Sequence, residues 1–109
     1  MGDKKMKLNG VPIDLFLDLE VDITIHELAY DMAHEENNEE RLKIYEEYDK
    51  CTRLLKIGQS QIKHGLKNWD WNFAVEKGLL CINDLGVFKE ELEEAGINCE
   101  EWKKKYRRS

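Results

Sequence analysis

The sequence predicts a mainly α-helical fold: a small bundle of about five helices organised on one long helix over residues 39–65, preceded by a short β-hairpin or strand over about residues 5–23. Apolar residues recur at steps of four and three over residues 39–65, the spacing of one helical face. Every second residue over residues 11–25 is apolar, the period of a strand. One proline and seven glycines among 109 residues argue against a turn-rich all-β fold. We expect a single domain over residues 1–109, long enough to bury a core.

The first part of the chain carries the predicted β element. Residues 1–5 are charged and expected to fray, and Asn9-Gly10 is the favoured dipeptide of a type I′ hairpin turn. Every second residue from Val11 to Ile25 is apolar, and all four acids of this stretch fall between them. This pattern favours one long strand, or two pieces with a bend, within residues 6–23. Helix is the competing interpretation of residues 14–19, because Leu and Asp are poor strand formers.

Residues 24–109 are predicted to be helical. Thr24 and Glu27 have the spacing of a capping box, so a helix is expected to begin at Thr24 and to end near His34. A polar break over residues 35–40 follows. Asn37 or Asn38 is expected to cap the next helix, because asparagine side chains accept hydrogen bonds from the first free N–H groups of a helix.

The long helix over residues 39–65 is defined by an apolar seam. Gly58 lies on this seam, where a small residue would allow close approach of another backbone or a kink in the helix. His64-Gly65 is the expected end. The seam is made of Ile44, Tyr48, Cys51, Leu55, Gly58 and Ile62.

Three further helices are predicted after residue 67. The first spans residues 71–85, again with apolar steps of four and three. The second spans residues 87–95 and is expected to stop at Gly96, with Ile97 as the hydrophobic partner of a Schellman motif. Asn98 is expected to cap the last helix.

The segment Thr24–Ala33 resembles the first helix of helix-turn-helix regulators, with its capped T-x-x-E-L-A run. The resemblance covers ten residues. Such regulators continue with a tight turn and a recognition helix, whereas this chain continues with the acidic run of residues 35–40, which would repel phosphate. No functional residue is therefore carried over from that family.

No catalytic signature is present in the sequence, so we expect no catalytic residues, no metal ligands and no cofactor. The three cysteines are widely spaced and form no CxxC pair, which suits free thiols in a reducing cytoplasm. No apolar run approaches the length of a membrane span. A metal-dependent hydrolase is the remote alternative. It is suggested by acid pairs one helical turn apart, such as Glu36 with Glu39 and Glu90 with Glu93.

Charge is distributed in blocks along the chain. The formal net charge is −6, and residues 14–47 contain twelve acids and two bases. We therefore predict a small acidic interaction protein, a binder, adaptor or inhibitor of another macromolecule, that meets a basic patch on a partner protein. The partner could itself bind nucleic acid, by an analogy of size and charge with small phage or mobile-element proteins. The candidate partner-binding residues are Asp18, Glu20, Asp22, Glu35, Glu36, Glu39 and Glu40.

The alternative is a nucleic-acid-binding regulator that uses a basic flank of the long helix. Residues 49–67 carry five bases and one acid, and Trp69 is expected to be exposed beside them and available for stacking. This chain would act as a monomer, or as a homodimer formed through the seam. The candidate residues are Lys50, Arg53, Lys56, Lys63, Lys67 and Trp69.

Overall fold

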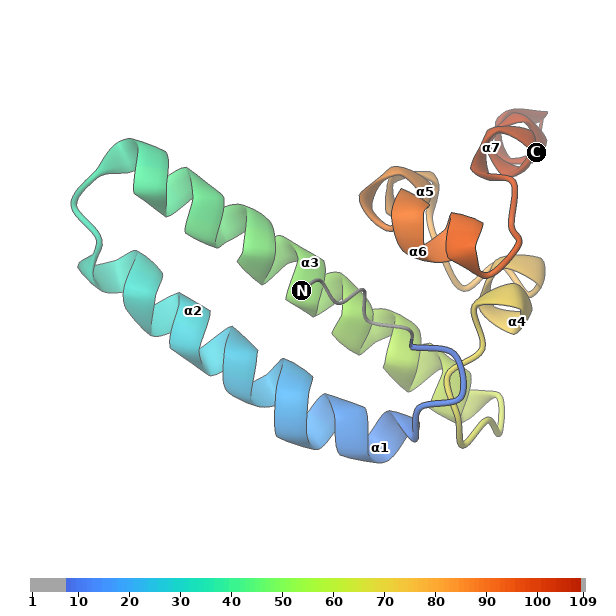
Figure 1. The fold of residues 1–109 in the computed structure, drawn as a ribbon, viewed down its shortest axis with the longest axis horizontal. Helices are drawn as coiled ribbons and strands as arrows, with labels where there is room; N and C mark the ends of the chain where they lie inside the picture. Colours follow the sequence, from blue (N-terminus) through green and yellow to red (C-terminus); the bar gives the residue numbers. More distant parts are fainter. Residues whose placement is uncertain (1–7, 109) are drawn as a thin grey trace. The chain divides into compact units, whose positions relative to one another are not determined.

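The computed structural model describes the backbone of residues 8–108 and the side chains of residues 8–106. This part of the chain is mainly helical, as predicted, and contains no strand. It divides into two compact units, one over residues 12–67 and one over residues 8–11 and 68–108. The elements in chain order are α1 (Ile13–Phe16), η1 (Leu17–Val21), α2 (Asp22–His34), α3 (Asn38–Lys63), α4 (Trp71–Glu76), α5 (Ile82–Val87), α6 (Lys89–Glu94) and α7 (Cys99–Arg108) (Figure 1).

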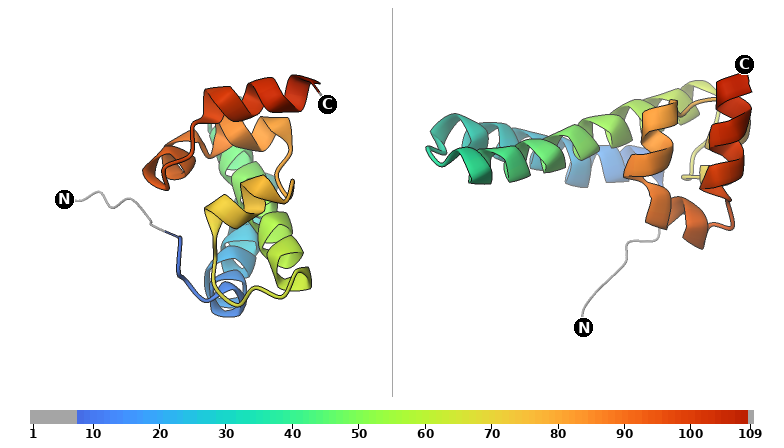
Figure 2. Two further views of the ribbon diagram at one scale, coloured as in Figure 1. Left: turned by 90° about the vertical axis from the view of Figure 1, so that its right-hand side faces the viewer. Right: turned by 90° about the horizontal axis from the view of Figure 1, so that it is seen from above.

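The unit over residues 12–67 is a helical hairpin. Its first three elements form one continuous helix, called helix 13–34 below, because Leu17 and Asp22 at the junctions both keep helical backbone angles. The long helix α3 runs back antiparallel beside it (Figure 2). The β element predicted over residues 6–23 is therefore wrong for residues 13–23, and its residues 6 and 7 lie outside the described part. Thr24 lies inside helix 13–34, so the predicted helix start there is wrong as well.

The start of helix 13–34 has the alternating apolar pattern of a strand because two faces of the helix are apolar. Ile13, Leu17 and Val21 are buried, whereas Leu15 and Leu19, halfway between them in sequence, are exposed. Residues four apart share a helical face, so two apolar faces offset by two residues give period-two alternation. The middle of the helix is a π-helical turn, η1. Its wider i→i+5 winding brings residues four apart closer to one line.

The long helix α3 has the ends that the sequence predicted. Oδ1 of Asn37 accepts hydrogen bonds from the N–H groups of Glu39 at 2.8 Å and Glu40 at 3.2 Å. At the other end Gly65 has φ +89°. A 3.0 Å bond from the N–H of Leu66 to the carbonyl of Gln61 completes a Schellman stop. The helix passes through Gly58 without a break.

The seam predicted along α3 is only partly buried. Ile44, Tyr48 and Leu55 are half-buried, and Ile62 is exposed. The fully buried large side chains of α3 are Ile57 and Gln61, which lie off the seam. Within its hairpin α3 has a single helical neighbour, so the seam is not enclosed as it would be in a bundle.

In the second unit the single helix predicted over residues 71–85 is two helices. Helix α4 ends at Glu76, Gly78 takes φ +72°, and α5 begins at Ile82. A 2.8 Å bond from the N–H of Leu79 to the carbonyl of Ala74 closes the turn. Positive φ is incompatible with a continuing helix, so the apolar periodicity continues across the end of α4 and does not mark one helix.

The core of this unit is built on aromatic side chains. Trp69 and Trp71 pack edge to face, with ring centroids 5.3 Å apart, and Trp71 lies 5.4 Å from Phe88. Leu85 of α5 and Leu92 of α6 are also buried in this unit. Burial of aromatic rings supplies much of the hydrophobic stabilisation of a small unit.

Turn residues of this unit behave largely as the sequence predicted. Gly96 has φ +86°, and the N–H of buried Ile97 donates to the carbonyl of Leu92 at 3.0 Å, which is the predicted Schellman stop. Oδ1 of Asn98 accepts the N–H of Glu101 at 3.2 Å, as expected of a cap. The turn at Asn9-Gly10 differs. It closes through a 2.9 Å bond from the N–H of Val11 to the carbonyl of Leu8.

That turn is not the predicted type I′ hairpin. Gly10 has φ +88°, but Asn9 does not have positive φ, whereas a type I′ turn requires positive φ at both central residues. The flanking backbone pairs with a distant segment: Gly10 donates to the carbonyl of Trp69, and Trp69 donates to that of Val11, both at 2.8 Å. The turn therefore does not join two paired strands, so it does not need the backbone twist of a type I′ turn.

Candidate functional site

The predicted acidic residues lie on helix 13–34 and over residues 35–40. Residues 35–40, which comprise the loop after this helix and the start of α3, are called the hairpin turn below. Asp18 and Asp22 are four residues apart and share one side of the helix, whereas Glu20 lies on another side. All three are exposed, as are Glu36, Glu39 and Glu40. Glu35 is half-buried, and its carboxylate accepts the backbone N–H of Asn37 at 3.2 Å. Glu35 therefore helps to shape the turn, and six of the seven predicted acids face solvent.

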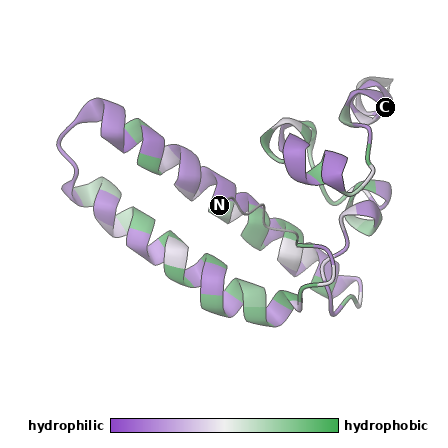
Figure 3. Ribbon diagram, viewed as in Figure 1, coloured by the Kyte–Doolittle hydropathy of each residue, from purple (hydrophilic) through white to green (hydrophobic). Residues whose placement is uncertain are grey.

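A feature that the sequence interpretation missed is an apolar stripe on the exposed side of helix 13–34. We call it the outer stripe. Hydrophobic residues recur along the whole of this helix in Figure 3, whereas the first half of α3 is mostly hydrophilic. The signal in the sequence was the spacing of four residues between Leu15, Leu19 and Ile23. The strand interpretation placed these residues on the same face as the residues that are buried in the helix. The outer stripe consists of Leu15, Leu19, Ile23 and Tyr30, which are 57%, 61%, 48% and 65% exposed.

Aspartate and glutamate are the only residues of helix 13–34 that carry formal charge when histidine is counted as neutral. Residues 13–34 contain six acids, no lysine and no arginine. Nε2 of His26 lies 3.7 Å from Oδ1 of Asp22 on the exposed surface. Exposed pairs of this kind contribute little to the stability of a protein. The formal charge of the helix that carries the outer stripe is therefore negative.

The C-terminal end of the outer stripe is aromatic. The rings of Tyr30 and His34 stack with centroids 4.1 Å apart, and Nδ1 of His34 lies 2.9 Å from the carbonyl oxygen of Tyr30. A shallow, open hollow lies beside Tyr30 and is lined also by His26, Glu27 and Asp31. Its form suits the edge of a macromolecular contact better than an enclosed ligand site.

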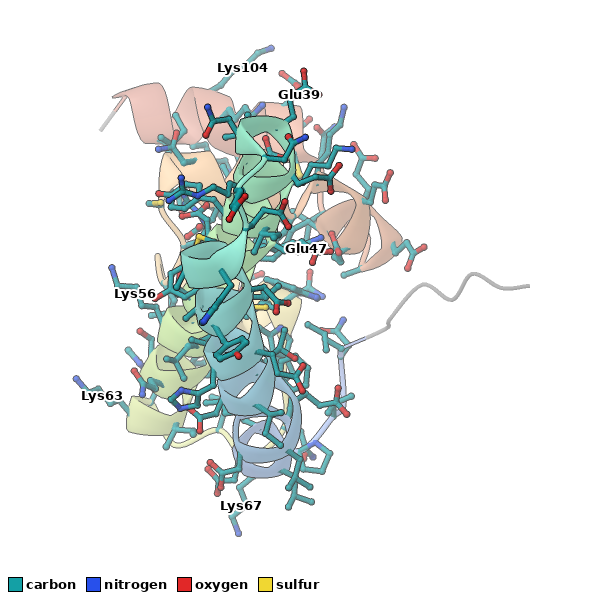
Figure 4. All side chains as sticks on the ribbon, turned by 90° about the vertical axis from the view of Figure 1, so that its left-hand side faces the viewer. Glu39, Glu47, Lys56, Lys63, Lys67 and Lys104 are labelled. Carbon is teal, nitrogen blue, oxygen red and sulfur yellow. The ribbon has the colours of Figure 1, made fainter. Side chains whose placement is uncertain are left out.

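The predicted basic flank of α3 is divided. Lys56 and Lys63 are exposed and point to the same side of the helix, and Lys67 is exposed beyond the helix end (Figure 4). Arg53 and Lys50 are half-buried. Nε of Arg53 donates to Oδ2 of Asp49 at 2.8 Å, so part of its charge is neutralised within α3.

Trp69 is not the exposed stacking residue that was predicted. Its side chain is 2% exposed and packs against Trp71. The backbone bonds of Trp69 with Gly10 and Val11 hold it in the core of its unit. The extended backbone of Asp70 precedes the helix start at Trp71, and both tryptophans are buried.

The three cysteines differ in their exposure. None of Cys51, Cys81 and Cys99 forms a disulfide bond. Burial raises the pKa of the Cys51 thiol, with a further contribution from Glu47, and burial followed by Glu93 raises the pKa of Cys99. Both changes favour the thiol over the nucleophilic thiolate. Over residues 8–106 no three His, Cys, Asp or Glu side chains converge as metal ligands would.

None of the helices in the described part of the chain has the length and apolar content needed to cross a membrane. Comparison with protein-family models, with curated proteins and with solved structures gives no significant match for this chain. The candidate site therefore depends on the geometry of helix 13–34 and the hairpin turn.

Proposed function

We propose that this chain is a non-enzymatic interaction protein that binds a basic surface of another protein through helix 13–34 and the adjoining hairpin turn. The single observation that supports the proposal most is the composition of residues 13–34, where six acids occur without lysine or arginine around an exposed helix. The acids of the turn extend the same charge to Glu36, Glu39 and Glu40.

Exposed carboxylates of this kind act mainly on encounter and specificity. Complementary potentials speed association and exclude partners of like charge. Their effect extends over a Debye length of about 10 Å at 0.1 M salt. The proposed complex should therefore form more slowly as salt is added.

A second candidate function is nucleic-acid binding through the exposed lysines of α3. The observation in its favour is that Lys56 and Lys63 point to one side, with Lys67 beyond them (Figure 4). Three lysines are a small electrostatic footprint for phosphate. The acids of helix 13–34 and the burial of Trp69 count against this candidate.

The proposal is tested by capture of partners from lysate with and without nuclease, using wild-type protein and two variants of equal net charge. The first variant carries Asp18→Lys, Glu20→Lys, Asp22→Lys and Glu36→Lys. The second, a control in the other unit, carries Glu76→Lys, Glu90→Lys, Glu93→Lys and Glu101→Lys, all at exposed positions. Circular dichroism and thermal unfolding establish that both variants fold.

We expect a nuclease-resistant protein partner that elutes at moderate salt, binds the control and is lost by the first variant. Equal binding by both variants would show that this surface does not determine recognition. Recovery of nucleic acid that depends on Lys56 and Lys63 would favour the second candidate.

A further inference from the structure

We infer that the outer stripe is a docking ridge for an amphipathic helix of a partner protein, one whose apolar ridge is flanked by lysine and arginine. This inference rests on the proposed function and specifies the chemistry of the partner. It adds an apolar contact to the electrostatic one, and the two contributions are separable by mutation.

The first argument is the alignment and exposure of the stripe. Leu15, Leu19 and Ile23 are about half exposed or more, although Ile13, Leu17 and Val21 already form the buried side of the same helix. Single exposed apolar residues are ordinary, but an aligned row on one face is typical of an interaction surface. The hairpin itself does not require these side chains to be apolar.

The second argument is the length of the stripe. Fifteen helical steps separate Leu15 from Tyr30, which at 1.5 Å per residue is about 22 Å. A partner helix of about four turns covers that length, and such helices are read through apolar residues spaced at i, i+3, i+4 and i+7.

The third argument is the charge on both sides of the stripe. Asp14, Asp18 and Asp22 each precede a stripe residue by one position, whereas Glu20 and Asp31 each follow one. Neighbouring helical positions are about 100° apart, so these acids flank the stripe on opposite sides. A partner helix with basic residues on both sides of its ridge would pair with both rows.

The same charges exclude a second copy of the chain as the preferred occupant. Two outer stripes packed together would bring the six acids of one helix against the six of the other, without lysine or arginine between them. Like charges at an interface disfavour association strongly. Homodimerisation through this face is therefore treated as an opposing outcome.

The test measures binding of synthetic helical peptides to the full chain by fluorescence anisotropy. The first peptide has 18 residues, with leucines on one helical face and lysine and arginine beside them. The second has the same composition in a scrambled order that destroys the ridge, and the third replaces the basic residues by glutamate. We expect the first peptide to bind at least about tenfold more tightly than either of the others.

The matched variants are Leu19→Ser on the stripe and Leu42→Ser on α3, since these leucines are 61% and 59% exposed. We expect Leu19→Ser to weaken binding of the first peptide about tenfold, the effect of losing one buried leucine contact. Leu42→Ser should change it less than about twofold. Thermal unfolding of both variants should match wild type because both side chains face solvent.

Several results would overturn the inference. They are equal binding of the ordered and scrambled peptides, no binding of either, or an unchanged affinity in Leu19→Ser. Sedimentation equilibrium showing a dimer that Leu19→Ser dissociates would assign the stripe to a second copy. The charge-reversal variant of Asp18, Glu20, Asp22 and Glu36 is compared with Leu19→Ser. If the charge reversals abolish binding of the first peptide and Leu19→Ser does not weaken it, the proposed function is supported and the docking role of the outer stripe is contradicted. If only Leu19→Ser weakens binding of the first peptide, the docking role of the outer stripe is supported and the proposed function of the acidic residues is contradicted.

Discussion

The backbone N–H of Trp71 donates a 2.8 Å hydrogen bond to Oδ1 of Asn9, a residue 62 positions earlier in the chain. Trp71 is the first residue of α4, and the first N–H groups of a helix have no partner inside it. Asp70 satisfies a second of these groups by accepting the N–H of Phe73 at 3.1 Å. The start of α4 is thus capped by one local and one distant side chain.

The Asn9→Ala variant should lower the free energy of unfolding by about 1–2 kcal/mol, because it leaves a partly buried N–H without an acceptor. Chemical denaturation followed by tryptophan fluorescence measures the change. Asn83→Ala, at an exposed position of α5, is the control and should change stability by less than about 0.5 kcal/mol. Equal effects of the two variants would contradict the capping role.

Gly96→Ala should destabilise the protein by about 1 kcal/mol. Gly96 has φ +86°, and an added Cβ would meet no atom within 4 Å, so the cost arises from the left-handed backbone alone. Gly86→Ala is the matched control. That glycine lies in α5 without positive φ and with the same open space, and alanine there should stabilise the helix by about 0.5–1 kcal/mol. Thermal unfolding of both variants should give shifts of opposite sign.

The three thiols should react with iodoacetamide in the order Cys81, Cys51, Cys99. Cys81 is exposed, Cys51 is half-buried and Cys99 is buried. Burial also raises the pKa of Cys51 and of Cys99, which lowers the fraction of thiolate. Mass spectrometry of protein labelled at pH 8 for increasing times gives the order. Faster modification of Cys99 than of Cys81 would show that the α7 start opens readily.

Stability should fall as the pH rises above about 9 and further above about 10. Burial raises the pKa of Cys99 above its ordinary 9.0, and burial followed by Cys81 and Asp84 raises that of Tyr106 above its ordinary 10.0. The unfolded chain then loses these protons at lower pH than the folded chain. The stabilisation is complete below the unfolded pKa values and is lost as the pH passes through the folded ones.

The Tyr106→Phe variant separates the tyrosine contribution from that of the thiol. The hydroxyl of Tyr106 donates a 2.8 Å bond to the carbonyl of Leu80, so the variant should lose about 1 kcal/mol at neutral pH. Its free energy of unfolding should also decline less than that of wild type between pH 9 and 11. Urea denaturation across this range measures both effects, and parallel pH profiles for the two proteins would contradict the assignment.

Local signals in the sequence were sufficient for the caps and stops. Asn37, Gly65, Gly96 and Asn98 act where they were predicted to act, because each satisfies free groups of its own helix end through neighbours in sequence. Gly78 was the exception. Its position inside an apolar periodicity concealed the stop that divides residues 71–85 into α4 and α5.

The candidate site was predictable in part. The exposed acids of residues 18–40 were identified from composition, because charged side chains seldom lie inside a protein without partners. The outer stripe was concealed, since Leu15 and Leu19 are apolar like the buried residues between which they stand. Trp69 was predicted to be exposed, whereas backbone bonds with Gly10 and Val11, which are distant in sequence, hold it in the core of its unit.

By itself the sequence determined the mainly helical class, the extent of the long helix and the acidic character of residues 14–47, because each depends on composition or on contacts within a few residues. Tertiary structure alone decided that residues 13–23 are helix and not strand, that Trp69 is buried, and which apolar face of helix 13–34 stays in solvent. The physical reason is that an alternating apolar pattern satisfies a strand and a two-faced helix equally well. The choice between them is made by which partner surface buries one of the two faces, here α3.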